Sequence, residues 1–168
     1  MIQLFKNSLK YKDSEGNMQD SGVLFASETE PEYQLIETIV CDGTYGNIVR
    51  NNLSLTHAKI YLHTQKSESA TSIYVEARND AGLCGYAWIG SALSTGGERW
   101  SRVNLVSDGK RAYCNYVGPV SAIHEANTLY ETVNVLDAST PINSIKINAS
   151  GGIMYPKGTI IEIYGVQA

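Results

Sequence analysis

The sequence predicts an all-β protein whose main domain is an antiparallel β-sandwich or barrel. From residue 33 onward, short runs rich in β-branched and aromatic residues follow one another, and turn residues separate them. Asp108 and Gly109 lie between two alternating runs, which is the strongest local hairpin signal in the chain. No segment of the series predicts a long helix. Repeated short strands at this spacing are typical of sandwiches and barrels.

Residues 1–32 are expected to form an N-terminal attachment arm and linker. Residues 9–12 and 22–25 have the composition of two strands around a turn, which predicts a small β-hairpin. Residues 27–32 are acidic, contain a proline and show no periodicity, as a linker would. A lone hairpin is marginal in water, so we expect the arm to pair with the main domain or with another chain. The alternative, that these strands open the same sandwich as residues 33–168, is equally compatible with the sequence.

The main domain, residues 33–168, divides into short strands. The expected strands are residues 33–40, 53–63, 72–77, 83–89, 99–106 and 111–117. Residues 79–82 and 107–110 are expected to be the turns of two hairpins. Residues 121–126 are expected to be a loop or a short helical turn, because their apolar residues also fit helical spacing. A strand is favoured for residues 128–136.

The last strong strand signals lie in residues 142–166. Two β-branched runs, residues 145–147 and 159–164, flank a link rich in glycine and proline. We expect them to form an antiparallel pair that closes the domain. Alternation in the second run places Glu162 on the outside, as a surface or inter-subunit residue.

Composition excludes several classes of partner. The chain has 168 residues, is 43% hydrophobic and 18% charged, and carries a formal charge of −4, so it has no basic field for nucleic acid. No apolar run approaches the ~18 residues of a membrane span, and no signal peptide is expected at the start. Three cysteines, an odd number, are expected to be reduced and mostly buried, which indicates folding in a cytoplasm.

No catalytic, metal or cofactor motif is visible, and we expect no enzyme activity, metal or cofactor. His57 and His63 can share a strand, but six residues separate them by ~20 Å, so one zinc ion cannot take both. A Cys–His pair depends on the fold and has no local signature. Paired carboxylates for glycoside hydrolysis would need two facing acids. The candidates carry no local signature: Glu76, Glu125, Glu131 and Glu162.

Aromatic side chains in the middle strands offer the best binding candidates. Exposed rings can act as flat apolar platforms for sugars, with neighbouring polar groups fixing the hydroxyls. Tyr86 and Trp88 are expected on one face. The candidate ligand-binding residues are Trp88, Trp100, Arg99, Arg102 and Tyr113, with Trp100 preferred as the exposed ring. The same residue types also serve ordinary cores and subunit interfaces, and that interpretation stays open.

Two stretches resemble virion structural proteins of tailed bacteriophages. Residues 9–24, LKYKDSEGNMQDSGVL, are similar to the strand, Tyr-Lys-Asp, Gly-Asn turn and strand at the start of fibre or tail-associated proteins. Residues 158–166, GTIIEIYGV, following residues 142–147, resemble the close of jelly-roll modules in such proteins. Residues 33–136 match nothing in that family. The collagen-like or coiled-coil shaft of fibres is missing, which leaves room for a short spike or a capsid decoration.

The resemblance implies an antiparallel jelly-roll-like β-sandwich displayed on a virion that is assembled in the host cytoplasm. Other virion proteins would be partners through the N-terminal arm, and the module would be a homotrimer. A non-enzymatic structural role that contributes to host-surface attachment is the leading expectation. The alternatives are a carbohydrate-binding module that recognises host cell-surface glycan as a receptor-binding lectin, and a glycan-modifying enzyme domain.

Overall fold

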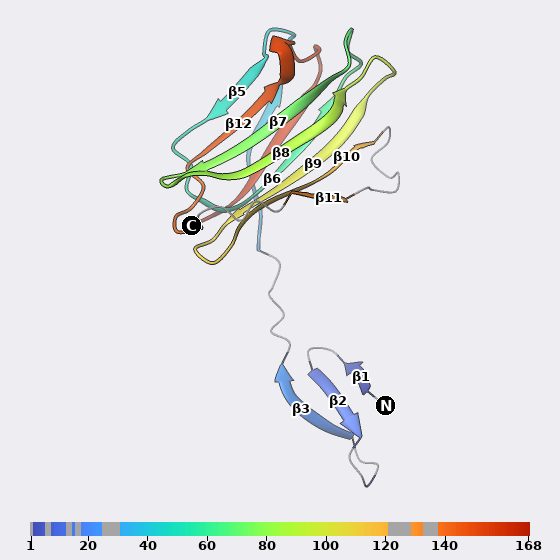
Figure 1. The fold of residues 1–168 in the computed structure, drawn as a ribbon, viewed down its shortest axis with the longest axis vertical. Helices are drawn as coiled ribbons and strands as arrows, with labels where there is room; N and C mark the ends of the chain where they lie inside the picture. Colours follow the sequence, from blue (N-terminus) through green and yellow to red (C-terminus); the bar gives the residue numbers. More distant parts are fainter. Residues whose placement is uncertain are drawn as a thin grey trace. The chain divides into compact units, whose positions relative to one another are not determined.

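The computed structural model describes residues 2–5, 8–12, 15, 18–24, 31–120, 129–132 and 138–168. The chain separates into two compact units, Met1–Pro31 and Glu32–Ala168. Both units are built from β-strands, which are labelled in Figure 1.

The first unit is a three-stranded antiparallel sheet in the order β1-β2-β3. Its strands are β1 (Ile2–Phe5), β2 (Ser8–Lys12) and β3 (Met18–Leu24). The expected hairpin corresponds to β2 and β3, although β3 begins four residues earlier than expected. Strand β1 was not expected, and it pairs along the other side of β2. A third strand removes the weakness of an isolated hairpin. Most of the expected linker lies outside the described residues.

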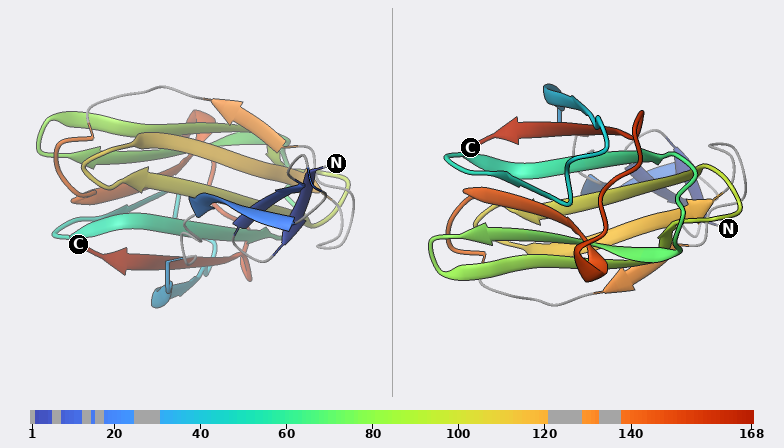
Figure 2. Two further views of the ribbon diagram at one scale, coloured as in Figure 1. Left: turned by 90° about the horizontal axis from the view of Figure 1, so that it is seen from below. Right: turned by 90° about the horizontal axis from the view of Figure 1, so that it is seen from above.

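The second unit is a sandwich of two antiparallel sheets packed face to face (Figures 1 and 2). The six-stranded sheet has the order β11-β10-β9-β6-β13-β4, with β11 (Leu129–Thr132), β10 (Ala112–Val120), β9 (Arg99–Ser107), β6 (Leu55–Thr64), β13 (Ile160–Gln167) and β4 (Gln34–Val40). The four-stranded sheet has the order β5-β12-β7-β8, with β5 (Asn47–Arg50), β12 (Ser144–Ala149), β7 (Thr71–Asn79) and β8 (Gly82–Leu93).

The strand order is that of a jelly roll with one addition. Without β10 and β11, the sheets are β4-β13-β6-β9 and β5-β12-β7-β8, which is the strand order of the eight-strand double Greek key. Strands β10 and β11 widen one sheet beyond β9. The prediction of an all-β sandwich is confirmed.

The two hairpins predicted from local turns are confirmed, but the predicted closing pair is wrong. Strand β7 pairs with β8, and β9 pairs with β10. Strand β12 instead pairs with β5 and β7, whereas β13 pairs with β4 and β6 in the opposite sheet. The chain between them contains η1 (Ser150–Gly152) and crosses from one sheet to the other. Glycine and proline are common both in hairpin loops and in segments that cross between sheets, so the composition of this segment did not distinguish the two.

The core lies between the sheets and follows strand alternation. In β6, Ala58, Ile60 and Leu62 are buried while their neighbours along the strand are partly exposed. In β13, Ile161 and Ile163 are buried, and the residues that alternate with them, including Glu162, face outward as predicted. All three cysteines are buried and free of disulfides, as expected.

An ion pair closes the open side of the sandwich between β4 and β5. Glu37 of β4 and Arg50 of β5 belong to different sheets, and the Arg50 guanidinium donates to both oxygens of the Glu37 carboxylate, from Nη2 at 2.7 Å and from Nε. Strand β5 was not expected, because a four-residue edge strand carries little periodicity. It nevertheless supplies the cation of this bridge.

The chain joins the sandwich at Tyr33, whose ring rests on the six-stranded sheet. The ring meets His57 edge-on at 6.4 Å between centroids, and the Lys59 Nζ lies 3.9 Å from its centre. Both partners belong to β6. Aromatic and cation–π contacts of this kind fix the point at which β4 starts.

Candidate functional site

The five predicted ligand-binding residues do not form one site. Trp88 belongs to β8 in the four-stranded sheet, whereas the other four belong to β9 and β10 in the six-stranded sheet. The sandwich core separates the outer faces of these two sheets. Two candidate surfaces therefore replace the single predicted site.

The first surface is an aromatic cluster on the four-stranded sheet, formed by Tyr74, Tyr86 and Trp88. Trp88 lies directly opposite Tyr74 in the ladder between β7 and β8, and it is 53% exposed. The rings of Tyr74 and Tyr86 are 5.9 Å apart and tilted by 37°. Tyr86 and Trp88 share a face, as predicted, since both alternate with buried Ala87. This cluster presents the most exposed ring among the described tryptophans.

Polar groups border the aromatic cluster on the neighbouring strands. Asn148 of β12 lies opposite Tyr74, and Lys146 lies opposite Glu76. Arg78 Nη2 is 3.5 Å from a Glu76 carboxylate oxygen, so the charges in this region pair locally. Partial burial, with Tyr74 and Glu76 nearby, raises the pKa of Tyr86, which keeps its phenol protonated at neutral pH. Apolar rings beside amide and hydroxyl donors are suited to a ligand with both apolar and hydroxyl-bearing faces.

The second surface surrounds Trp100 on the six-stranded sheet. The Trp100 ring stacks on His63 of β6, with centroids 3.6 Å apart and planes only 6° from parallel. Nε2 of His63 lies 2.9 Å from a Glu98 carboxylate oxygen. Trp100 is partly buried by this stack, so it is less open to a ligand than Trp88. Gly118 makes room beside it, because a Cβ at this glycine would lie 2.5 Å from the Trp100 carbonyl oxygen.

Of the other predicted ligand-binding residues, Arg102 alone accompanies Trp100 on this surface. It lies two residues along β9 on the same face, opposite Tyr61 of β6. Arg99 alternates to the other side of the strand. Tyr113 lies opposite Val106, six residues and about 20 Å along β9 from Trp100. Arg99 and Tyr113 are therefore placed apart from the stacked pair.

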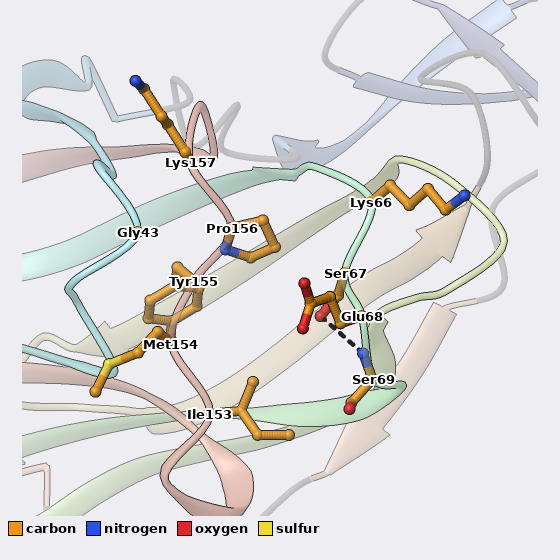
Figure 3. Close-up of a pocket in the computed structure, with 10 residues that line it drawn as sticks. All are labelled: Gly43, Lys66, Ser67, Glu68, Ser69, Ile153, Met154, Tyr155, Pro156 and Lys157. Carbon is orange, nitrogen blue, oxygen red and sulfur yellow. Dashed lines mark hydrogen bonds between the residues drawn. The ribbon is translucent and has the colours of Figure 1, made fainter.

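A pocket of about 440 Å³ lies in the loops at the end of the sandwich where β13 begins (Figure 3). Its lining consists of Gly43, residues 66–69 and residues 153–157. Tyr155 is fully buried in this lining, and its hydroxyl has no hydrogen-bond partner among the described residues. Burial also raises the pKa of Tyr155 far above its usual value. Nothing in the sequence marked these loops, because no motif connects them.

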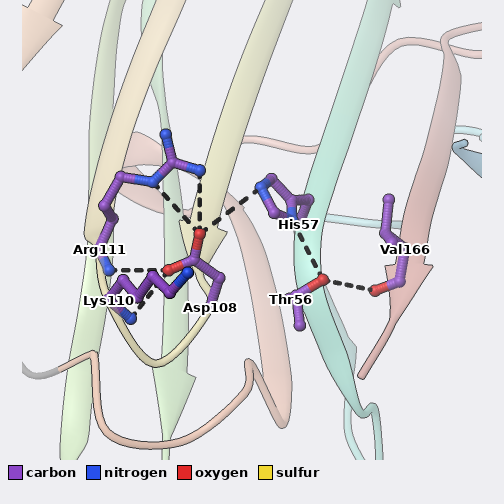
Figure 4. Close-up of polar contacts among 6 residues, drawn as sticks. All are labelled: Thr56, His57, Asp108, Lys110, Arg111 and Val166. Carbon is purple, nitrogen blue, oxygen red and sulfur yellow. Dashed lines mark hydrogen bonds and ion pairs between the residues drawn. The ribbon is translucent and has the colours of Figure 1, made fainter. Parts of the chain in front are cut away.

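A polar cluster centred on Asp108 secures the β9–β10 turn (Figure 4). The Asp108 carboxylate accepts from the backbone amides of Lys110 and Arg111 at 2.9 and 2.8 Å, and from the Arg111 guanidinium at 3.0 Å. His57 Nε2 is 4.0 Å away, and its Nδ1 is 3.0 Å from the Thr56 hydroxyl. The carboxylate has a turn-stabilising role, since most of its bonds go to the turn that follows it.

The thiols are arranged for packing. Burial is the main cause that raises the pKa of Cys41 and Cys84 to about 11 and that of Cys114 to about 12. A thiol with such a pKa stays protonated at neutral pH and is a poor nucleophile. Within the described part of the chain, no three His, Cys, Asp or Glu side chains gather as metal ligands.

Comparisons with known families and with curated sequences add no relationship. No known protein family matches the chain, and no curated protein sequence matches it. Among the described residues, no helix has the length and apolar character needed to cross a membrane.

Proposed function

We propose that the protein is a non-enzymatic structural component of a tailed-bacteriophage particle, displayed as a short fibre, spike or decoration. The observation that carries the proposal is the division of the chain into a small β-unit, Met1–Pro31, and a jelly-roll sandwich, Glu32–Ala168. Such a division suits one unit that docks on other virion proteins and another that faces outward. The resemblance of residues 9–24 and 158–166 to phage virion proteins supports the same role.

The test is incorporation into particles. A variant that lacks residues 1–30 is compared with the full chain in a phage whose own copy of the gene is deleted. The truncated protein is expected to remain soluble and folded, as judged by circular dichroism, and to be absent from purified particles. Incorporation at the level of the full chain would remove the docking role of the arm. The module is also proposed to be a homotrimer, which light scattering measures directly.

A second candidate function is binding of host-surface saccharide, and the exposed aromatic cluster favours it. Tyr74, Tyr86 and Trp88 combine apolar rings with the neighbouring amide of Asn148 and the ion pair of Glu76. A glycan array is the direct measurement. Trp88→Ala is expected to abolish the signal, whereas Trp100→Ala, on the opposite face, serves as the matched control and is expected to retain it. An array without any signal for the native protein would leave display as its function.

A further inference from the structure

On the outer face of the six-stranded sheet, Arg102 and Glu162 lack partners of opposite charge among the described residues. Arg102 takes part in no ion pair or side-chain hydrogen bond among the described residues, and its Nε is buried without a partner. Glu162 accepts a hydrogen bond from the Tyr164 hydroxyl at 3.3 Å but meets no cation there. Among the described residues of this face, Lys59 is a further cation outside any ion pair, and its ammonium rests on the Tyr33 ring.

Arg102 and Glu162 do not pair with each other within one sheet. Both lie opposite Tyr61 of β6, Glu162 from β13 on one side and Arg102 from β9 on the other. Two strand spacings place their backbones about 10 Å apart. Tyr61 lies on the strand between them, and its ring meets Tyr164 edge-on at 5.6 Å between centroids. Within the described part of the sheet, neither charge is therefore neutralised by the other.

The surroundings of this charge pair match the core of a protein–protein interface. Interface cores are enriched in Tyr, Trp and Arg. Glu162, Tyr61 and Arg102 form a row across three strands, and this row lies beside Tyr164, which pairs with Tyr61, and beside the His63–Trp100 stack. At the β4 edge of the same sheet, Leu35 and Val40 are 54% and 62% exposed. Both lie opposite outward-facing residues of β13, so apolar side chains border the charged row.

Two buried polar atoms on the face also lack partners. These are Arg102 Nε and Asn104 Oδ1, although the Asn104 amide nitrogen donates to Asn115 at 2.6 Å. Both atoms are closed to solvent, so a molecule docked on the face does not contact them. On the opposite face, the Glu76 carboxylate already pairs with Arg78.

The area of the face is at the lower end of the range for a standard interface. Six strands about 4.8 Å apart, with about eight residues each at about 3.3 Å per residue, cover roughly 600–750 Å². A standard interface buries about 800 Å² on each partner. A copy of the same chain provides both the area and the complementary charges.

We propose that this face binds a second copy of the chain, with Arg102 of one copy against Glu162 of the next. The pairing works in a twofold dimer, where it forms twice, and in a closed ring, where it forms once per interface. This proposal shares with the proposed function only the expectation that copies of the chain associate. Particle incorporation can fail while this association stands, and the reverse also holds, so the two experiments have independent outcomes.

Charge reversal with rescue tests the proposal on the full chain. Arg102→Glu, Glu162→Arg and the double variant are compared with the native protein by light scattering and sedimentation over a concentration series. Each single reversal places like charges together and is expected to weaken self-association at least about 10-fold. The double variant restores opposite charges and is expected to return to within about 3-fold of the native value. Val49→Glu, which introduces a charge at an exposed position of β5 in the four-stranded sheet, is the control and is expected to leave self-association unchanged.

Several outcomes would overturn the proposal. A native protein that stays monomeric at about 100 μM, far above the dissociation constants of stable complexes, would mean that the face receives a different molecule. Single reversals that leave assembly unchanged, or a double variant as weak as the singles, would place the interface elsewhere. Near-ultraviolet circular dichroism verifies the fold of each variant. Arg102→Gln and Glu162→Gln replace any reversal that fails to fold, and each is expected to weaken association by several-fold.

Discussion

The two outer faces of the sandwich have similar residue types but arrange their charges differently. On the four-stranded sheet, Glu76 pairs with Arg78, and the exposed Trp88 lies beside this local pair. On the six-stranded sheet, Arg102 and Glu162 flank Tyr61 and lack partners of opposite charge among the described residues. A face with internally paired charges suits a neutral ligand. A face with divided charges suits a partner that carries the complementary pattern.

Both faces depend on one core, so the largest effect is expected from core truncation under either sheet. Ile147 of β12 and Ile60 of β6 are fully buried in the same cluster, each beneath a different sheet. Ile147→Ala and Ile60→Ala are each expected to lower the free energy of unfolding by about 2–5 kcal/mol, because each leaves a cavity. Urea denaturation measures both, with Val49→Ala as an exposed control. If one substitution were tolerated, the sheets would be energetically separate.

The β9–β10 turn of the six-stranded sheet is expected to depend on pH. Partial burial raises the pKa of Asp108, but the bonds from Lys110 and Arg111 outweigh it, so its pKa is lowered. A lowered pKa means that Asp108 stabilises the fold above its unfolded pKa, near 3.8, and that this contribution disappears as pH falls through the folded pKa. Asp108→Ala is expected to cost about 1–2 kcal/mol at pH 7.

Urea unfolding at pH 7 and pH 2 measures this dependence. The difference between the native protein and Asp108→Ala should shrink at the lower pH. Asn79 holds the corresponding β7–β8 turn by accepting from Ala81 at 3.0 Å, and it does not titrate. The cost of Asn79→Ala should therefore be the same at both pH values. A cost of Asp108→Ala that is constant with pH would contradict the assignment.

The two tryptophans are expected to separate stability from binding. Trp100 stacks on His63, and Trp88 is more than half exposed. Trp100→Ala should therefore destabilise the protein by about 0.5–1.5 kcal/mol more than Trp88→Ala, the usual worth of an aromatic pair. Thermal unfolding of the two variants gives the comparison. Equal costs would show that the stack contributes nothing beyond the area that it buries.

The smallest effect is expected from the ion pair that joins the two sheets. The hydrogen bond from Arg50 lowers the pKa of Glu37, so its contribution is present above the unfolded pKa, near 4.5, and is lost as pH falls through the folded pKa. Both side chains are about one-third exposed, 36% and 35%, and solvent screening limits the pair to about 0.2–1 kcal/mol. Glu37→Gln measured by urea unfolding at pH 7 and pH 3 tests this. A cost above about 2 kcal/mol would mean that the bridge controls sheet packing.

Local signals predicted the local parts of the fold. The β7–β8 and β9–β10 hairpins were predictable because their turns and alternating strands are adjacent in sequence. The partners of β12 and β13 were not predictable, because strand propensity does not specify which strand pairs with which. Strands β1 and β5 are four residues long and too short for a clear period.

The candidate sites show the same division between local and distant information. Tyr86 and Trp88 were expected on one face because they are two residues apart on one strand. The distribution of the five candidate residues over two sheets, and the row of Glu162, Tyr61 and Arg102, depend on pairings across more than 40 residues of sequence. Such pairings follow from the path of the whole chain, and no local pattern in the sequence encodes them.

The attachment of Tyr33 to β6 has a mechanical consequence. Strand β4 begins where β13 ends, since Gln34 lies opposite Gly165, so the chain joins and leaves the sandwich at the same end. Tension between these two points would unzip the β4–β13 ladder one rung at a time, starting at Gln34. Tension between Tyr33 and the loops of the pocket, at the other end, would instead shear every rung of that ladder together. A sandwich held at Tyr33 and pulled at those loops is loaded in its strongest direction.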